Sequence, residues 1–268
     1  MSKLTKLFKT LKLVIKQPSL VNHILNADEV WSNYIKNKNL GNPTLPIVDI
    51  ENLIPNFNVR LDYFTFLGGG SLPTDIILLK ELAGQIKNCN YFEIGTFRGE
   101  SVVNVAQKAK ECYTLNLSKQ QIIDLNLPDH FADVIGFFSK DKSNIIHLEG
   151  DSLTFDYAGL NKKFDLIFID GNHTFDYVKS DTINVFKHLM HENTIVVWHD
   201  YAYTPEKTRP EILAAILEGV PKNEHQHLYH VSNTLCAIYT KKSFKTYNFE
   251  AVSVPKKVFE IDVKIKSL

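Results

Sequence analysis

The sequence has 268 residues, of which 44% are hydrophobic and 22% charged, a composition typical of a soluble globular protein with a sizeable core. Thirty basic and thirty acidic side chains balance, so the overall charge does not indicate a nucleic-acid partner. Cys89, Cys112 and Cys236 form neither a disulfide framework nor a CxxC metal pair, and no apolar run approaches the roughly 20 residues of a membrane span. We therefore expect a cytoplasmic protein of enzyme size.

A first helix is expected within residues 1–20, and its charge is uneven. Lysines precede the first acid, Asp28, and apolar residues recur between them at helical spacing. Such a helix could lie on an anionic membrane surface, as in a protein peripheral to the membrane. Alternatively, it could pack on the main domain or across a homodimer, with its lysines simply solvated. The lysines interrupt any apolar segment that a signal peptide would need.

Residues 41–60 show no clear periodicity and are expected to form a connecting arm. The run Gly68-Gly69-Gly70-Ser71 predicts either a flexible hinge or a lid over a cofactor. A helix is expected to begin at Pro73, because proline in a first turn followed by threonine and aspartate is a typical start signal. The expected division is a helical extension and arm at 1–60, an α/β domain at 61–240 and a tail at 241–268.

From residue 91 onward, short apolar strands alternate with helices. Near-continuous apolar runs are typical of parallel strands covered on both faces, and the last two runs are close enough to form an antiparallel pair at one edge. The expected strands are 91–95, 112–117, 144–149, 164–170, 194–199, 226–231 and 235–240. This pattern predicts an α/β fold with a doubly wound, seven-stranded, mostly parallel sheet of the Rossmann-like type.

The turn after the first expected strand is the most informative segment. Glu93 is followed by Gly95 and then by Gly99, and a helix is expected to begin at Ser101. A strand that ends at glycines before a helix leaves backbone N–H groups uncovered, so a ligand can approach closely. The carboxylate of Glu93 repels phosphate but suits a cationic or hydroxyl-bearing ligand. The segment therefore favours an S-adenosylmethionine site over a nucleotide-phosphate site.

Ligands of doubly wound sheets bind beyond the carboxyl ends of the strands. Polar side chains stand at or just after the end of each expected parallel strand. In chain order they are Glu93, Asn116, Asp151, Ser152, Asp170, His173, His199 and Asp200. Because adjacent strands lie about 4.8 Å apart, carboxylates at neighbouring ends could share one cation. An oxygen-rich group of this kind suits Mg²⁺ or Mn²⁺ better than zinc.

Three segments, in order, resemble class I S-adenosylmethionine-dependent methyltransferases: Glu93–Gly99, Asp165–Asp181 and Val197–Tyr201. More narrowly, residues 61–240 look like the O-methyltransferases of methyltransferase family 24, which act on sugars and natural products and have cephalosporin-hydroxylase-like relatives. The resemblance implies O-methylation of a sugar, glycan or small natural product with S-adenosyl-L-methionine as the cofactor.

The resemblance also implies roles for individual residues. Asp151 would accept from the adenine amino group, and His173 would be the catalytic base together with Asp170. A divalent ion would be held by Asp170 and Asp200. The residues expected to bind the cofactor are Glu93, Gly95, Thr96, Gly99, Asn116, Asp151 and Ser152.

Two positions depart from the family pattern. The second strand ends in Asn116, where relatives have an acid that binds the ribose, although an amide can also hydrogen-bond a diol. His199 stands where some relatives have a glutamate before the second metal acid. Its imidazole could ligate Mn²⁺ or Fe²⁺, or the site could be free of metal.

Each site residue also has a purely structural interpretation. The glycines could serve only tight packing, Asp151 could cap a turn, Asp170 could form an Asx turn, and His173 could be a helix cap or surface residue. A non-catalytic cofactor-binding protein of the same fold is therefore an alternative. A nicotinamide-dependent Rossmann enzyme is a weaker one, because it requires G-x-G-x-x-G and an acid about 20 residues further on. The sequence has neither.

Overall fold

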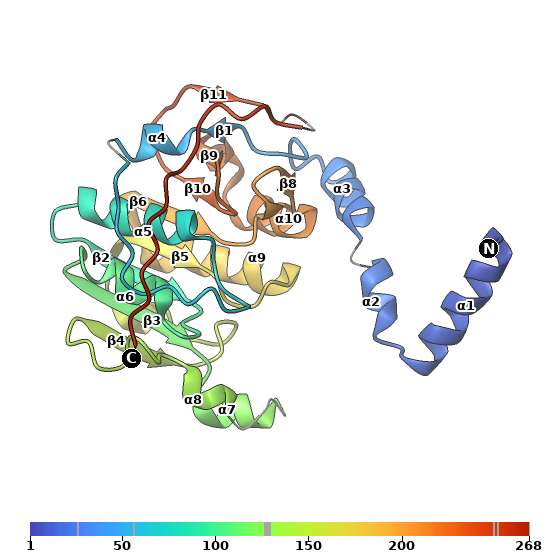
Figure 1. Ribbon diagram of the computed structural model, residues 1–268, viewed down its shortest axis with the longest axis horizontal. Coiled ribbons are helices and arrows are strands. Elements are labelled where there is room, and N and C mark those ends of the chain that lie inside the picture. Colours follow the sequence, from blue (N-terminus) through green and yellow to red (C-terminus); the bar gives the residue numbers. More distant parts are fainter. Residues whose placement is uncertain (26, 56, 126–129, 249, 251, 268) are drawn as a thin grey trace.

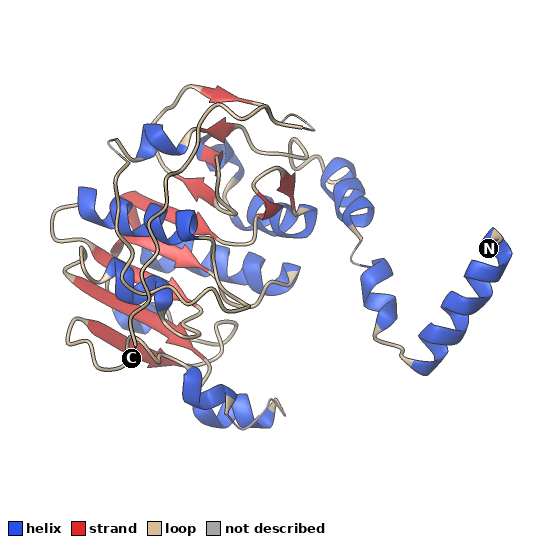
Figure 2. Cartoon of the chain, in the orientation of Figure 1, coloured by secondary structure: helices blue, strands red, loops and turns tan. Residues whose placement is uncertain are grey.

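The structure is a computed structural model that describes residues 1–267 except 26, 56, 126–129, 249 and 251. A mixed β-sheet forms its centre, with helices packed on both faces (Figures 1 and 2). Within the described residues the sheet has nine strands in the order β11-β1-β9-β10-β6-β5-β2-β3-β4. A separate pair, β7 and β8, forms a small hairpin.

The five strands β4, β3, β2, β5 and β6 are mutually parallel, whereas β10 runs antiparallel to both of its neighbours. The strand bounds are β1 Ile47–Val48, β2 Asn90–Ile94, β3 Glu111–Asn116, β4 Ile145–Glu149, β5 Phe164–Ile169, β6 Met190–Trp198, β7 Ala202–Thr204, β8 Lys207–Thr208, β9 Leu228–Val231, β10 Ala237–Tyr239 and β11 Thr246–Tyr247. All seven strands expected from the sequence are present, and the predicted α/β fold is confirmed.

The predicted placement of the final antiparallel pair at the edge of the sheet is wrong. β10 pairs with β6, and beyond β9 the sheet continues through β1 and β11. β1 comes from the expected connecting arm and β11 from the expected tail. Each has only two residues, which is too short for the alternating pattern of a strand to show in the sequence. The domain boundaries at 60 and 240 stay predictions.

The helices alternate with the parallel strands as the sequence predicts. Their bounds are α1 Lys3–Lys16, α2 Leu20–Leu25, α3 Asp28–Asn37, α4 Ile50–Leu53, α5 Pro73–Gln85, α6 Glu100–Val105, α7 Lys119–Asp124, α8 Phe131–Val134, α9 Phe175–Asn184 and α10 Pro210–Gly219, with shorter turns η1 Ala158–Leu160, η2 Val185–Leu189 and η3 Lys222–His227. The predicted start at Pro73 is confirmed, and the Asp75 carboxylate accepts from the Leu72 N–H at 2.6 Å.

Buried side chains cover both faces of the sheet and hold these helices in place. One cluster joins the sheet to α9 and α10, and the other joins it to α4, α5 and α6. Helices α9 and α10 pack closely at Gly219, the last residue of α10. A Cβ at this position would lie 2.6 Å from the Cβ of Thr182 in α9. The indole N–H of Trp198 in β6 donates to the Thr182 hydroxyl at 2.9 Å. This packing fixes the ends of β5 and β6, which carry most of the predicted site.

The N-terminal helices are joined to this body through α3. Trp31 of α3 stacks on Phe175 of α9 with ring centroids 4.7 Å apart, and the Tyr34 hydroxyl donates to Glu218 of α10 at 2.6 Å. In contrast, α1 and α2 project away from the body (Figure 1), and α1 has no buried residue. Among the described residues, packing of the first helix on the main domain is therefore not found. No helix in the described part of the chain has both the length and the apolar composition that a membrane span requires.

Candidate active site

The glycine turn after β2 is shaped by close backbone contacts. Gly95 and Gly99 have φ values of 100° and 80°, which L side chains rarely adopt. A Cβ on Gly95 would lie 2.0 Å from the carbonyl oxygen of Asp170, and one on Gly99 would lie 2.4 Å from the hydroxyl of Ser139. Both glycines are thus required by packing, and Gly95 joins the end of β2 directly to the end of β5.

Glu93 lies beneath this turn and is completely buried. Its carboxylate accepts from the hydroxyls of Tyr91, Ser101 and Thr114 at 2.8, 2.7 and 2.9 Å. Burial raises the pKa of Glu93 to about 7, although the three hydroxyl donors oppose the shift. Glu93 therefore supports the turn from inside the protein. Thr96, also buried, shares a hydrogen bond of 2.5 Å with the Thr114 hydroxyl.

At the ends of β3 and β4, the side chains expected around the nucleoside have partners within the protein. The amide of Asn116 donates to the carbonyl of the next residue at 3.1 Å. One oxygen of Asp151 accepts from the Leu153 N–H at 3.0 Å, and the other accepts from the Tyr177 hydroxyl at 3.3 Å. Asp151 thus caps a turn, as its structural interpretation requires, and also ties that turn to α9. Its contact with adenine stays a prediction.

Asp181 of α9 is a buried acid near the same turn that the sequence analysis did not identify. One of its oxygens accepts from the Tyr157 hydroxyl at 3.5 Å, and the other has no hydrogen-bond partner among the described residues. Burial raises the pKa of Asp181 to about 7, although the hydroxyls of Ser152 and Tyr157 oppose the shift. A helical aspartate inside the Asp165–Asp181 segment carries no sequence signal for burial.

Acids and histidines come together at the ends of β5 and β6. These strands are neighbours in register, with Ile169 opposite Trp198, so the residues that follow them meet at one edge. The Nδ1 of His173 lies 3.0 Å from an oxygen of Asp200. The Nδ1 of His199 lies 3.1 Å from Asp170 and 3.5 Å from Asp200. The sequence prediction that these four residues share a rim is thus matched by their placement.

His199 is buried, and both of its ring nitrogens face carboxylates. Its Nε2 lies 3.2 Å from an oxygen of Asp75, in the first turn of α5. Burial alone would lower the pKa of His199, but Asp170, Asp200 and Asp75 together raise it well above its ordinary value. A protonated imidazole only donates, so it has no lone pair for a metal. Asp75 was expected only as a helix-start residue, because 124 positions separate it from His199.

The other three members of the cluster are more accessible. The side chains of Asp170, His173 and Asp200 are 21%, 45% and 26% exposed. One ligand atom from each lies within 4.8 Å of the others, so these three could hold a metal ion. The prediction of His199 as a ligand remains untested, but the structure adds His173 as a candidate.

The same cluster shifts the titration of its accessible members. Burial alone would raise the pKa of Asp200, but hydrogen bonds from His173 and His199 hold it well below its usual range. Burial alone would lower the pKa of His173, but the bond to Asp200 and the charges of Asp170 and Asp200 outweigh it and raise this pKa. Asp200 is therefore ionised, and His173 is a stronger base than a free histidine.

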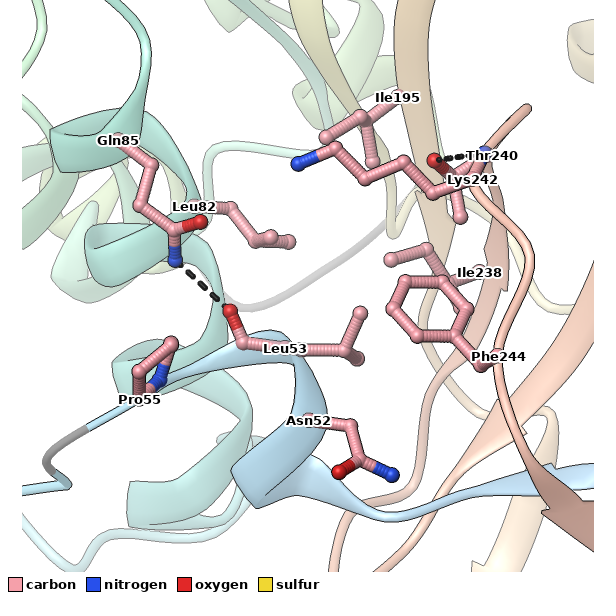
Figure 3. Close-up of a pocket in the computed structure, with 10 residues that line it drawn as sticks. All are labelled: Asn52, Leu53, Pro55, Leu82, Gln85, Ile195, Ile238, Thr240, Lys242 and Phe244. Carbon is pink, nitrogen blue, oxygen red and sulfur yellow. Dashed lines mark hydrogen bonds between the residues drawn. The ribbon is translucent and has the colours of Figure 1, made fainter.

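A cavity of about 180 Å³ lies at the opposite end of the sheet. It is lined by residues from the end of α5, from β6 and from the end of β10, among them Leu82, Ile195 and Ile238 (Figure 3). In Figure 3 the Gln85 amide donates to the Leu53 carbonyl, at 2.8 Å. Ile195 lies within β6, three residues before Trp198 at its carboxyl end, whereas Asp200 follows that end. This cavity contains none of the predicted site residues.

Comparison with known families identifies the domain in which the rim lies. The model of a family described as a methyltransferase domain matches residues 92–201. The match runs from within β2 to the residue after Asp200, so it includes every predicted site residue. The chain carries a class I S-adenosylmethionine-dependent methyltransferase domain. The predicted family resemblance and the predicted enzyme class are confirmed.

Solved structures similar to this methyltransferase include two with S-adenosylhomocysteine bound. A Podospora anserina methyltransferase is 17% identical, with 65% of this chain and 80% of that chain covered and a TM-score of 0.44. An O-methyltransferase from Bacillus cereus is 16% identical, with 65% and 84% covered and a TM-score of 0.46. A search of the curated proteins found no match.

Proposed function

We propose that this methyltransferase transfers a methyl group from S-adenosylmethionine to a hydroxyl of a sugar, glycan or small natural product. The observation that carries the proposal is the Asp170–His173–Asp200 cluster beside the glycine turn. Because the backbones of Gly95 and Asp170 are in contact, a cofactor at the turn would lie next to these side chains. The cluster supplies both a base and negative charge where a hydroxyl acceptor needs them.

In this proposal His173 removes the proton of the acceptor. The hydrogen bond from its Nδ1 to Asp200 fixes the tautomer and leaves Nε2 able to take the hydroxyl proton, a step typically worth about 10²–10⁴-fold. The resulting alkoxide attacks the methyl carbon of the sulfonium. A C–O bond forms as the S–CH₃ bond breaks, and the electron pair of that bond returns to sulfur, which leaves S-adenosylhomocysteine. Alignment of the two substrates contributes the remainder of the rate acceleration.

The donor set also fits a divalent ion. Two carboxylates and one imidazole, from Asp170, Asp200 and His173, are ligands that Mn²⁺ and Fe²⁺ accept, and the carboxylates suit Mg²⁺. When bound, such an ion would lower the pKa of the acceptor hydroxyl. Asp75 and His199 would hold the two carboxylates in position from the buried side.

The β7–β8 hairpin borders the accessible side of the cluster. Arg209, just after β8, donates to the carbonyl of His173 at 3.1 Å, and its guanidinium carbon lies 5.8 Å from the centre of the Tyr203 ring. Tyr203 is 45% exposed. An exposed ring and a cation beside the base suit an acceptor that offers both a ring face and polar groups, which supports a sugar or phenolic acceptor.

The test is transfer of labelled methyl from S-adenosylmethionine into a panel of sugars and phenols, with chelator-treated protein and with Mg²⁺ or Mn²⁺ added. We expect label in at least one hydroxyl acceptor. Activity of the chelated protein would assign the chemistry to His173 and Asp200 alone, whereas restoration by a metal would support the ion. Label found only in nitrogen acceptors would contradict O-methylation. Cofactor binding without transfer to any acceptor would support the non-catalytic alternative.

A further inference from the structure

The first helix leaves an apolar face uncovered. With about 100° of rotation per residue, the apolar side chains of α1 other than Leu13 fall on one arc, whereas most of the lysines fall on the opposite side, where Leu13 also lies. The apolar arc is formed by Leu4, Leu7, Phe8, Leu11, Val14 and Ile15. Phe8 is 65% exposed and Ile15 is 79% exposed, and no residue of the helix is buried. Nothing in the described part of the chain covers this face.

The charge of the helix limits what can cover it. All five charged side chains of α1 are lysines, and no acid precedes Asp28. A second copy of α1 would bring two sets of lysines together without any carboxylate to pair with them. An anionic lipid surface offers acyl chains that can bury the apolar arc and negatively charged headgroups that can pair with the lysines. With 14 residues the helix is about 21 Å long, too short to cross a bilayer but long enough to lie on it.

The helix is tethered to the methyltransferase near its site. Asp28, the first residue of α3, accepts from the Tyr203 hydroxyl at 2.8 Å and pairs with Lys207 at 3.2 Å. Both partners belong to the β7–β8 hairpin that borders His173. Through α2 and α3, a surface bound by α1 would be held on the side of the molecule that carries this hairpin (Figure 1).

We infer that α1 is an interfacial helix that binds this protein to an anionic lipid bilayer, with Phe8 and its apolar neighbours in the bilayer surface and the lysines against the lipid headgroups. The inference does not rest on the proposed hydroxyl acceptor, because its readout is lipid binding. Lipid contact also supplies the packing that a 14-residue helix lacks in water.

The first experiment is co-sedimentation of the full chain with phosphatidylcholine vesicles, either alone or with about a third of phosphatidylserine. We expect binding to the anionic vesicles only. Binding should fall when salt is raised to about 0.5 M, where the screening length drops below about 5 Å. Absence of binding to anionic vesicles at low salt would overturn the inference.

Charge-reversal variants test the surface itself. The triple variant Lys6→Glu, Lys9→Glu, Lys12→Glu should bind anionic vesicles at least about 100-fold more weakly. The matched control, Lys87→Glu, Lys110→Glu, Lys222→Glu, makes the same change in net charge at exposed lysines outside α1 and should keep its binding. Equal loss in both would show that only net charge matters and would overturn the assignment to α1.

Apolar variants separate lipid from a second copy of the chain. Leu7→Ser, Phe8→Ser, Leu11→Ser should reduce vesicle binding at least about 10-fold and leave the mass in solution unchanged. A dimer that these substitutions convert to monomer, with vesicle binding unaffected, would assign the face to self-association instead.

Discussion

The Nδ1 of His173 lies 3.0 Å from a carboxylate oxygen of Asp200, although the two residues follow different strands. The backbone of Asp200 has a φ of 53° in this arrangement, a left-handed conformation that is uncommon for a residue other than glycine. Such strain concentrates where a side chain must be placed for function. The pair leaves Nε2 of His173 as the nitrogen able to receive a proton, and this relationship carries the predictions on activity.

Asp200→Ala should abolish methyl transfer, with a loss of turnover of about 10²–10⁴-fold, because His173 loses its orienting partner and the cluster loses a carboxylate. Calorimetry should find the affinity for S-adenosylhomocysteine within a few-fold of the wild type. Asp141→Ala, at an exposed site outside the rim, is the control and should keep full activity. Normal turnover of Asp200→Ala would remove Asp200 from the mechanism.

His173→Gln keeps hydrogen-bonding capacity toward Asp200 but cannot take a proton. We expect turnover to fall about 10²–10⁴-fold while S-adenosylhomocysteine still binds. His188→Gln, a change of the same kind in η2, which follows the carboxyl end of α9, should have little effect. Equal activity in the two variants, measured by label transfer, would show that another group acts as the base.

Gly95→Ala should destabilise the protein by more than about 3 kcal/mol, because the new Cβ would lie 2.0 Å from the Asp170 carbonyl oxygen. Gly68→Ala is the matched control, since nothing lies within 4 Å of the Cβ it would add, and it should change the stability by less than about 0.5 kcal/mol. Urea unfolding measures both. If Gly95→Ala is as stable as the control, the close contact between the ends of β2 and β5 is not present.

Asp181→Asn tests the buried acid behind the rim. The folded-state pKa of Asp181 is raised to about 7, so the contribution of this group favours folding most below about pH 4, where the carboxyl is protonated in both states, and is lost as the pH rises towards 7. The loss is on the order of 4 kcal/mol at neutral pH. An asparagine does not titrate, so the variant should gain stability relative to the wild type between about pH 4 and 7, with no further gain above.

The measurement for Asp181→Asn is the free energy of unfolding as a function of pH. The expected result is a difference between variant and wild type that grows with pH and then levels off. A difference that is constant from pH 4 to 8 would mean that the carboxyl of Asp181 titrates normally and is in contact with water.

Much of the candidate site could be predicted from the sequence, because it lies where strands end. Asp170 and Asp200 each follow an apolar run, Glu93 lies one residue before the end of β2, and in a parallel sheet these ends share one edge. Asp75 and Asp181 could not be found in this way. Each is on a helix, and its role depends on which strand end that helix packs against. Likewise, the two-residue strand β1 forms by pairing with the edge of β9, and β11 forms by pairing with β1.

By itself, the sequence determined the parallel sheet, the glycine turn after β2 and the amphipathic first helix, because hydrophobic periodicity and turn residues act over a few neighbouring positions. The tertiary structure alone decided the partners of the site residues. It buried Glu93 under three hydroxyls, surrounded His199 with Asp75, Asp170 and Asp200, and left His173 accessible beside Asp200. Hydrogen-bond partners and desolvation depend on which segments meet in space, and no local pattern records that.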